Sequence, residues 1–223
     1  MLSLKNIGKR FGEHQILDGL SVEIPLTGIT FIVGASGSGT SGLCRLAVGL
    51  LKPDAGEVSL FGERVDLMPE RKLIEMRARA PYLVQGPALL DWLTLRENVA
   101  LADPPSKSDG RADKALERLG LTEFSARKPP EVGPGIRKRA AIARALVLEP
   151  EVLLLDEPTT GLDKEAAGQV NDALALVREQ GLGVALVSHD YAALRKLADR
   201  VVQVKDKKVG FNGSALDFLT APH

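Results

Sequence analysis

The stretch that decides the fold is Gly34-Ala35-Ser36-Gly37-Ser38-Gly39-Thr40-Ser41, a glycine-rich loop. An apolar run from Ile29 to Val33 precedes the loop, and a mostly apolar stretch from Leu43 to Leu50 follows it. This order predicts a strand, a loop and a helix. Glycines let such a loop approach an anion closely, and the free N–H groups of the first helical turn bind it. The sequence therefore predicts a phosphate-binding loop over residues 34–41.

The loop departs at one position from the P-loop spacing G-x-x-x-x-G-K-[ST]. A lysine normally follows the last glycine and reaches the β- and γ-phosphates, but Thr40 occupies that position here. Ser41 keeps the hydroxyl that ligates Mg²⁺. From this stretch alone, a tight turn that binds nothing explains the residues equally well.

Length and composition favour one α/β domain of 223 residues. Residues 1–85 and 150–223 are expected to form a nucleotide-binding core with a β lobe, and residues 86–149 an inserted helical lobe. The 29 basic and 29 acidic residues balance, which argues against a nucleic-acid partner. The single cysteine, Cys44, allows no internal disulfide, and we expect it to be buried. No stretch approaches the roughly 20 apolar residues of a membrane span, and no signal peptide is evident, so we expect a cytoplasmic location.

The apolar pattern predicts an antiparallel β lobe that leads into a parallel sheet. Strands are expected at residues 2–7, 15–24, 29–33, 58–61, 82–84, 152–155, 184–187, 201–204 and 208–211. Helices are expected at residues 69–79, 93–102, 111–119, 140–148 and 164–180, with another ending near residue 200. Phe11 could stack on a base or could simply belong to the core.

Polar residues follow three of the expected strands. The apolar run Val152 to Leu155 delivers Asp156 and Glu157 to its carboxyl end, where open α/β sheets bind ligands. Asp156 could hold Mg²⁺ through water, and Glu157 could act as a general base on an attacking water. Gln85 could place its amide near a metal or that water, or could be a surface glutamine. His189 could contact a γ-phosphate or could be merely packed.

These pieces, in this order, resemble the nucleotide-binding subunit of ATP-binding cassette (ABC) transporters over essentially the whole chain. The matching residues are Phe11 as the adenine-stacking aromatic, Gly34 to Ser41 as Walker A, Gln85 as the Q-loop, Val152 to Glu157 as Walker B, Gly161 to Asp163 as the D-loop and His189 as the switch histidine. The resemblance implies a P-loop NTPase (RecA-like) fold that binds ATP and Mg²⁺. It implies catalytic roles for Glu157, His189 and Gln85, and metal-binding roles for Ser41, Gln85 and Asp156.

Within that family the chain looks most like the ATPase subunits of Mla- or Mce-type lipid transporters. The stretches that suggest this are residues 84–90 with 93–99, residues 136–146 and residues 156–163. The resemblance implies a dimer in which each ATP lies between one Walker A loop and the partner's signature motif. It also implies an integral membrane permease that contacts the chain through Leu89 to Val99, at the inner face of the cell membrane. Trp92 could anchor that contact or could pack within the helical lobe.

The signature motif, L-S-G-G-Q in this family, is the second departure. Aligned on Arg137, it reads Val132-Gly133-Pro134-Gly135-Ile136. Gly133 has no hydroxyl for the γ-phosphate of the partner's ATP, and Pro134 has no backbone N–H. Losing a preorganised donor to developing charge typically costs on the order of 10² to 10³ in rate. We therefore expect nucleotide binding with weakened or absent hydrolysis.

Two alternatives stay open at the level of the sequence. Gln85, Asp156, Glu157, Asp163 and His189 are all retained, which would suit a competent ATPase that tolerates Thr40. The chain could also be a regulatory module that no longer binds nucleotide. In a homodimer, each ATP site would lack both the lysine and the signature donors. With an intact partner subunit, one site would lack the lysine and the other would lack the signature donors.

Overall fold

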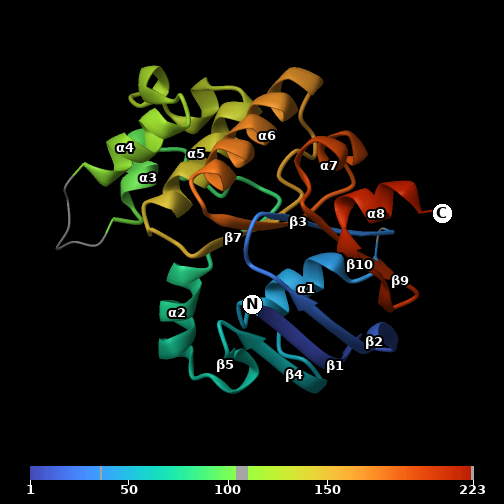
Figure 1. Cartoon of the computed structure of the whole chain (residues 1–223). Coiled ribbons are helices and arrows are strands. Elements are labelled where there is room, and N and C mark those ends of the chain that lie inside the picture. The colour runs from blue at the N-terminus through green and yellow to red at the C-terminus, as the bar shows by residue number, and fades with distance from the viewer. Residues whose placement is uncertain (36, 104–109, 222–223) are drawn as a thin grey trace.

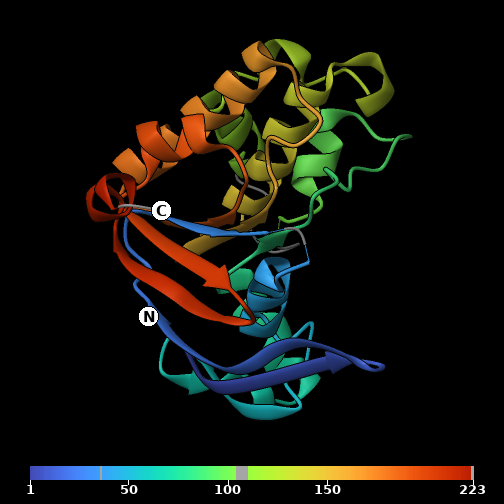
Figure 2. The same ribbon diagram turned by 90° about the vertical axis from the view of Figure 1, so that its right-hand side faces the viewer.

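A computed structural model describes residues 1–35, 37–103 and 110–221. Two β-sheets and the helices around them form stacked layers (Figures 1 and 2). The smaller sheet has the order β2 (His14–Ile24), β1 (Leu2–Phe11), β4 (Ala55–Leu60) and β5 (Glu63–Arg64), and all its pairs are antiparallel. It is the antiparallel β lobe that the sequence predicts.

The larger sheet has six strands and carries the loop. Its order is β10 (Lys208–Ser214), β9 (Arg200–Lys205), β3 (Ile29–Gly34), β8 (Gly183–Val187), β7 (Val152–Asp156) and β6 (Tyr82–Leu83). All neighbours are parallel except β10 and β9. Ile32 and Asp156 both pair with Val187, so the carboxyl ends of the three central strands lie together. Residues on β7 and β8 are buried throughout, as expected of strands covered on both faces.

Helices cover both faces of the larger sheet. Helix α1 (Thr40–Ala47) lies between the two sheets, and α2 (Glu70–Arg79) lies beside the smaller one (Figure 1). On the opposite face lie α3 (Leu95–Ala100), α4 (Arg111–Arg118), α5 (Pro134–Leu146), α6 (Lys164–Glu179), α7 (Tyr191–Leu197) and α8 (Ala215–Thr220). Short 3₁₀ turns occur at Val65–Leu67, Thr122–Phe124 and Pro129–Glu131.

Each face of the larger sheet has its own apolar cluster. One cluster packs α1 between the sheets and contains Leu43 and Cys44, which is buried as predicted. The other packs the sheet against helices α3 to α7. These two clusters fix the sheet, and therefore fix the ends of its strands relative to α1.

The structure corrects two sequence predictions. Helix α5 begins at Pro134 rather than at residue 140, because proline has no N–H to lose in the first helical turn and its φ suits a helix. Helix α8 was not predicted at all; Ser214 caps it by accepting a hydrogen bond from Asp217 N. Phe11 is 53 % exposed, which rules out the alternative that it belongs to the core. Within the described ranges no helix has the length and hydrophobicity needed to cross a membrane. The lobe boundaries at residues 85–86 and 149–150 stay a prediction.

Candidate functional site

The glycine-rich loop connects β3 to α1 at the carboxyl end of the larger sheet. Gly37 and Gly39 adopt positive φ angles of 80° and 94°, which side chains other than glycine rarely accept. A Cβ atom on Gly34 would lie 2.4 Å from Ser38 Oγ, so this position must be glycine as well. The loop N–H of Ser38 bonds to Ala35 O at 2.9 Å. Ser36, also predicted to bind phosphate, lies outside the described residues.

Thr40 begins α1 and is 7 % exposed. Its methyl group faces Gly34, because a Cβ atom there would lie 3.0 Å from Thr40 Cγ2. Helix α1 has no side-chain cap and no acidic residue in its first turn. Its N-terminus thus keeps the partial positive charge that favours an anion, without the cation that a lysine would add.

Ser41 and Asp156 meet directly, as the predicted metal site requires. Ser41 Oγ donates to Asp156 Oδ1 at 2.7 Å, and Tyr82 Oη donates to Asp156 Oδ2 at 2.7 Å. Arg45 lies 3.8 Å from the same Oδ2 atom. Asp156 is 4 % exposed, so these three groups take the place of water around its carboxylate. Desolvation raises the pKa of Tyr82, which keeps its hydroxyl a donor.

Glu157 and His189 also lie together, at the ends of β7 and β8. His189 Nε2 is 3.3 Å from Glu157 Oε1, and Thr160 Oγ1 donates to Glu157 Oε2 at 2.7 Å. Glu157 has a φ of 49°, in the left-handed region. This turn directs the carboxylate away from the strand and toward the histidine.

Gln85 reaches the same area through its backbone and not through its exposed side chain. Lys138 Nζ on α5 donates to Gln85 O and, at 3.4 Å, to Glu157 O. Burial lowers the pKa of Lys138, although Asp156 and Glu157 oppose that shift. Lys138 therefore connects two of the predicted catalytic segments.

The three predicted signature residues begin α5 and differ in their surroundings. Gly133 is the N-cap and Pro134 is the first helical residue. A Cβ atom on Gly133 would meet nothing within 4 Å, whereas one on Gly135 would lie 2.8 Å from Ala166 Cβ of α6. Gly135 thus allows the close packing of α5 on α6. Asp163, the predicted D-loop residue, caps α6 by accepting a hydrogen bond from Ala166 N at 2.8 Å.

Phe11 lies at the far end of β1, in the β1–β2 hairpin, where it pairs with His14. Lys9 Nζ is 5.5 Å from the centroid of its ring. The exposed face of the ring leaves room for a stacking partner.

The sequence profile described as "ABC transporter" matches residues 17–160. The chain belongs to the ABC transporter family. It is a nucleotide-binding domain, the ATP-binding subunit of such a transporter.

Individual relatives and solved structures agree with this assignment. The glutamate transport ATP-binding protein GluA of Corynebacterium efficiens is 31 % identical, and the match covers 100 % of this chain and 94 % of GluA. The probable sulfate/thiosulfate import ATP-binding protein CysA of Chlorella vulgaris is 35 % identical, over 98 % and 93 % of the two chains. The dimeric ABC cassette MJ0796 bound to ADP and Pi has a TM-score of 0.84 and 29 % identity, over 96 % and 99 %. The cbiO1 protein of Clostridium perfringens has a TM-score of 0.88 and 26 % identity, over 98 % and 90 %. The predicted P-loop ABC ATPase fold is confirmed.

The loop of this ABC domain offers a nucleotide backbone N–H groups and hydroxyls. Ser38 Oγ is buried and has no hydrogen-bond partner among the residues that the structure describes, and a buried hydroxyl of this kind is stabilised when an acceptor reaches it. Gly34 keeps the space beside it free of a Cβ atom. Ser41 and Asp156 are a suitable oxygen pair for Mg²⁺. The residues present therefore fit a nucleotide with its metal, apart from the missing lysine.

Sequence reasoning missed Tyr82, Thr160 and Lys138. At these three positions, the residue type alone does not indicate a functional site. Tyr82 has a recoverable signal, because β6 pairs with β7 and so places Tyr82 near the end that carries Asp156. Lys138 has none, because its contacts join segments 53 and 19 residues away in the chain.

Proposed function

We propose that this ABC domain binds Mg-ATP at residues 34–41 and drives a transporter mainly by binding, with weakened hydrolysis. The observation that carries the proposal is the bond between Ser41 Oγ and Asp156 Oδ1. It supports an intact metal-binding pair beside a loop in which Thr40 has replaced the lysine. Bound Mg-ATP would supply the energy of dimer closure, and the chain's own residues would hold its phosphates and metal.

The proposed binding residues follow from the geometry around the loop. Backbone N–H groups of the loop and of the first turn of α1 would hold the phosphates, with Ser38 Oγ as an added donor. Ser41, Asp156 and Gln85 would hold Mg²⁺, and Phe11 would stack on the base. Glu157 would orient water, with His189 and Thr160 holding its carboxylate.

Weakened hydrolysis follows from the two departures in the sequence. Thr40 carries no charge to the β- and γ-phosphates, and one charge-assisted hydrogen bond is worth about 1.5–3 kcal/mol. On the signature side, Gly133 has no hydroxyl and Pro134 has no N–H. The missing hydroxyl and N–H would have contacted the partner's nucleotide. With a partner subunit whose motifs are intact, one site of the dimer would therefore lack the lysine and the other would lack these two donors.

ABC cassettes dimerise and act with a membrane permease. The MJ0796 structure is described as dimeric, and cbiO1 as part of the transporter complex cbiONQ. For this chain we propose a second nucleotide-binding subunit across the signature face. We propose a permease contact through Leu89 to Val99, at the inner face of the cell membrane. Trp92 is 69 % exposed, so packing within the lobe does not explain it, and it would serve as the anchor.

The nature of the cargo is the least supported part of the proposal. A lipid cargo of the Mla or Mce type rests on three sequence stretches alone. The two relatives described above are named for glutamate and for sulfate or thiosulfate, and they lend no support to a lipid. A small polar anion is therefore the better-supported cargo class.

The test is a titration with a fluorescent ATP analogue, with and without Mg²⁺. Micromolar binding that needs Mg²⁺ and is lost in Asp156→Ala supports the proposal, whereas no binding favours a regulatory module without nucleotide. Turnover is measured in parallel, alone and with candidate partner subunits. Robust hydrolysis by the isolated chain that falls steeply in Glu157→Gln would show a competent ATPase and would overturn the weakened-enzyme proposal.

A further inference from the structure

Side chains, and not backbone pairing, hold the segment of residues 85–89. Within the described part of the chain, these residues form no backbone–backbone hydrogen bond with any other residue. Gln85, Gly86 and Ala88 are exposed, whereas Leu89 packs against the apolar cluster of the helical face. Side chains that reach the carbonyl groups of residues 85–88 can therefore restrain this part of the segment.

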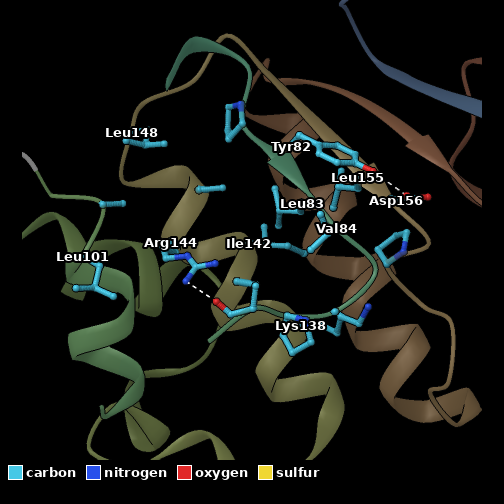
Figure 3. A pocket seen from close by; sticks show the side chains of 18 residues that line it. Tyr82, Leu83, Val84, Leu101, Lys138, Ile142, Arg144, Leu148, Leu155 and Asp156 are labelled. Atoms are coloured by element: carbon cyan, nitrogen blue, oxygen red, sulfur yellow. Dashed lines mark hydrogen bonds between the residues drawn. The ribbon is translucent and has the colours of Figure 1, made fainter. Parts of the chain in front are cut away.

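Two hollows flank the segment. A cavity of about 260 Å³ lies on one side, and its wall includes Leu101, Ile142 and Leu148 (Figure 3). A second hollow of about 400 Å³ lies on the other side, and its wall includes Pro134 and Leu162. Pro87, Ala88 and Lys138 line both. The partition, as we call the segment of residues 85–89, thus borders two spaces, and Leu89 at its end packs against the apolar cluster of the helical face.

Two cations of α5 hold the partition. Lys138 Nζ donates to Gln85 O, and Arg144 Nη1 donates to Ala88 O at 2.8 Å. Figure 3 shows Arg144 reaching across the cavity to that carbonyl. Hydrogen bonds from charged donors are stronger than those from neutral donors, so these two contacts dominate the restraint on the segment.

Of the two cations, Lys138 also has a partner outside the segment. The same Nζ atom lies 3.4 Å from Glu157 O, in the left-handed turn after β7. Lys138 is 9 % exposed, and a buried ammonium without acceptors is costly, so losing either carbonyl leaves the ammonium short of one acceptor. In the described part of the chain, Arg144 donates to Ala88 O and to no residue of this turn.

We propose that Lys138 is a positioning residue that ties the backbone of Gln85 to the backbone of Glu157. Helix α5 carries the tie, so a displacement of the 85–89 segment is transmitted to the turn that orients the Glu157 carboxylate. The functional importance of the tie rests on the proposed function of this site; its existence does not.

NMR of the backbone carbonyl carbons, in the full chain without nucleotide, tests the tie, because both contacts of Lys138 are to carbonyl oxygens. Lys138→Met keeps the length of the side chain but cannot donate, and we expect the carbonyl resonances of both Gln85 and Glu157 to move upfield. Lys138→Arg should restore both resonances. Arg144→Met is the matched control, and it should move the Ala88 carbonyl resonance while leaving that of Glu157 unchanged.

The result that would overturn the proposal is a carbonyl shift at only one of Gln85 and Glu157, or at neither, in Lys138→Met. Shifts throughout the chain, including β3 and α1, would indicate general destabilisation and would overturn it also. Lys138→Gln, a shorter polar variant, provides a second measurement if the methionine variant does not fold, and shifts at both residues are again required.

The fluorescence of Trp92 provides a second readout. A purely structural role of Lys138 would not alter its response to nucleotide. Trp92 is the chain's single tryptophan and follows the segment by three residues, so its emission reports on this region alone. With Mg²⁺ and a non-hydrolysable ATP analogue, the wild type should show an emission change that Lys138→Met loses and Lys138→Arg recovers. An equal change in wild type and Lys138→Met would overturn transmission through Lys138. Absence of nucleotide binding in every variant, by a separate fluorescent titration, would instead overturn the proposed function and leave the carbonyl shifts to decide the tie.

Discussion

The hydroxyl of Ser41 donates to Asp156 Oδ1 at 2.7 Å and joins two residues that are 115 positions apart in the chain. The bond connects the first turn of α1 to the end of a central strand. Both carboxylate oxygens of Asp156 already accept a hydroxyl, the second from Tyr82. A metal ion bound by Asp156 would therefore share its carboxylate oxygens with these two hydroxyl groups.

Substituting Asp156 with asparagine should separate stability from metal dependence. Asp156→Asn keeps the shape but places an amide NH₂ against a hydroxyl donor, and we expect a loss of about 1–3 kcal/mol in the free energy of unfolding. Urea unfolding measures this loss, and nucleotide titration should show that Mg²⁺ no longer improves binding. Tyr82→Phe is the control, because it keeps the Ser41 bond and should keep the Mg²⁺ effect. A Tyr82→Phe variant as metal-insensitive as Asp156→Asn would contradict this assignment.

Restoring the lysine should strengthen nucleotide binding. Thr40→Lys places a cation at the position from which the P-loop lysine reaches the phosphates, so we expect affinity for Mg-ATP to rise about tenfold or more. Thr40→Met has a similar length without charge and should leave affinity near that of wild type. Isothermal titration of both variants compares charge with bulk. Equal gains in both would show that side-chain volume, not charge, limits binding.

Replacing each of the two signature glycines with alanine should affect stability to different extents. In Gly135→Ala the new Cβ would lie 2.8 Å from Ala166 Cβ, so we expect a loss of about 1–3 kcal/mol in stability. Gly133→Ala meets open space and should change stability by less than about 0.5 kcal/mol. Chemical denaturation of the two variants tests the difference. If both variants lose the same amount, close packing of α5 on α6 is not the reason for Gly135.

Cys44 should make stability fall at alkaline pH. Burial raises its pKa from 9.0 to about 12, so the folded state retains a proton that the unfolded state loses. This contribution is complete below pH 9 and is lost as the pH rises toward 12. The difference in free energy of unfolding between wild type and Cys44→Ala should therefore shrink by about 1 kcal/mol for each pH unit above pH 9. Leu43→Ala also creates a cavity but removes no titrating group, so its difference from wild type should not depend on pH.

Much of the fold followed from local patterns in the sequence. The apolar runs before residue 34 and before Asp156 predicted buried parallel strands, because such strands need no polar face. The start of α5 was missed because Gly135 and the basic run Arg137 to Arg139 hid the helical period. Helix α8 was missed because it is short and follows directly from a strand.

The amino-acid sequence by itself determined the loop, the order of the motifs, the family, and the two departures at Thr40 and at Gly133-Pro134. Those features depend on residue type and spacing, which folding does not alter. Only the tertiary structure decided that Tyr82 shares Asp156, that Gly135 serves helix packing, and that Lys138 links Gln85 to Glu157. Each of these contacts joins chain segments distant in sequence, and their distances are set by how the sheet and α5 pack together.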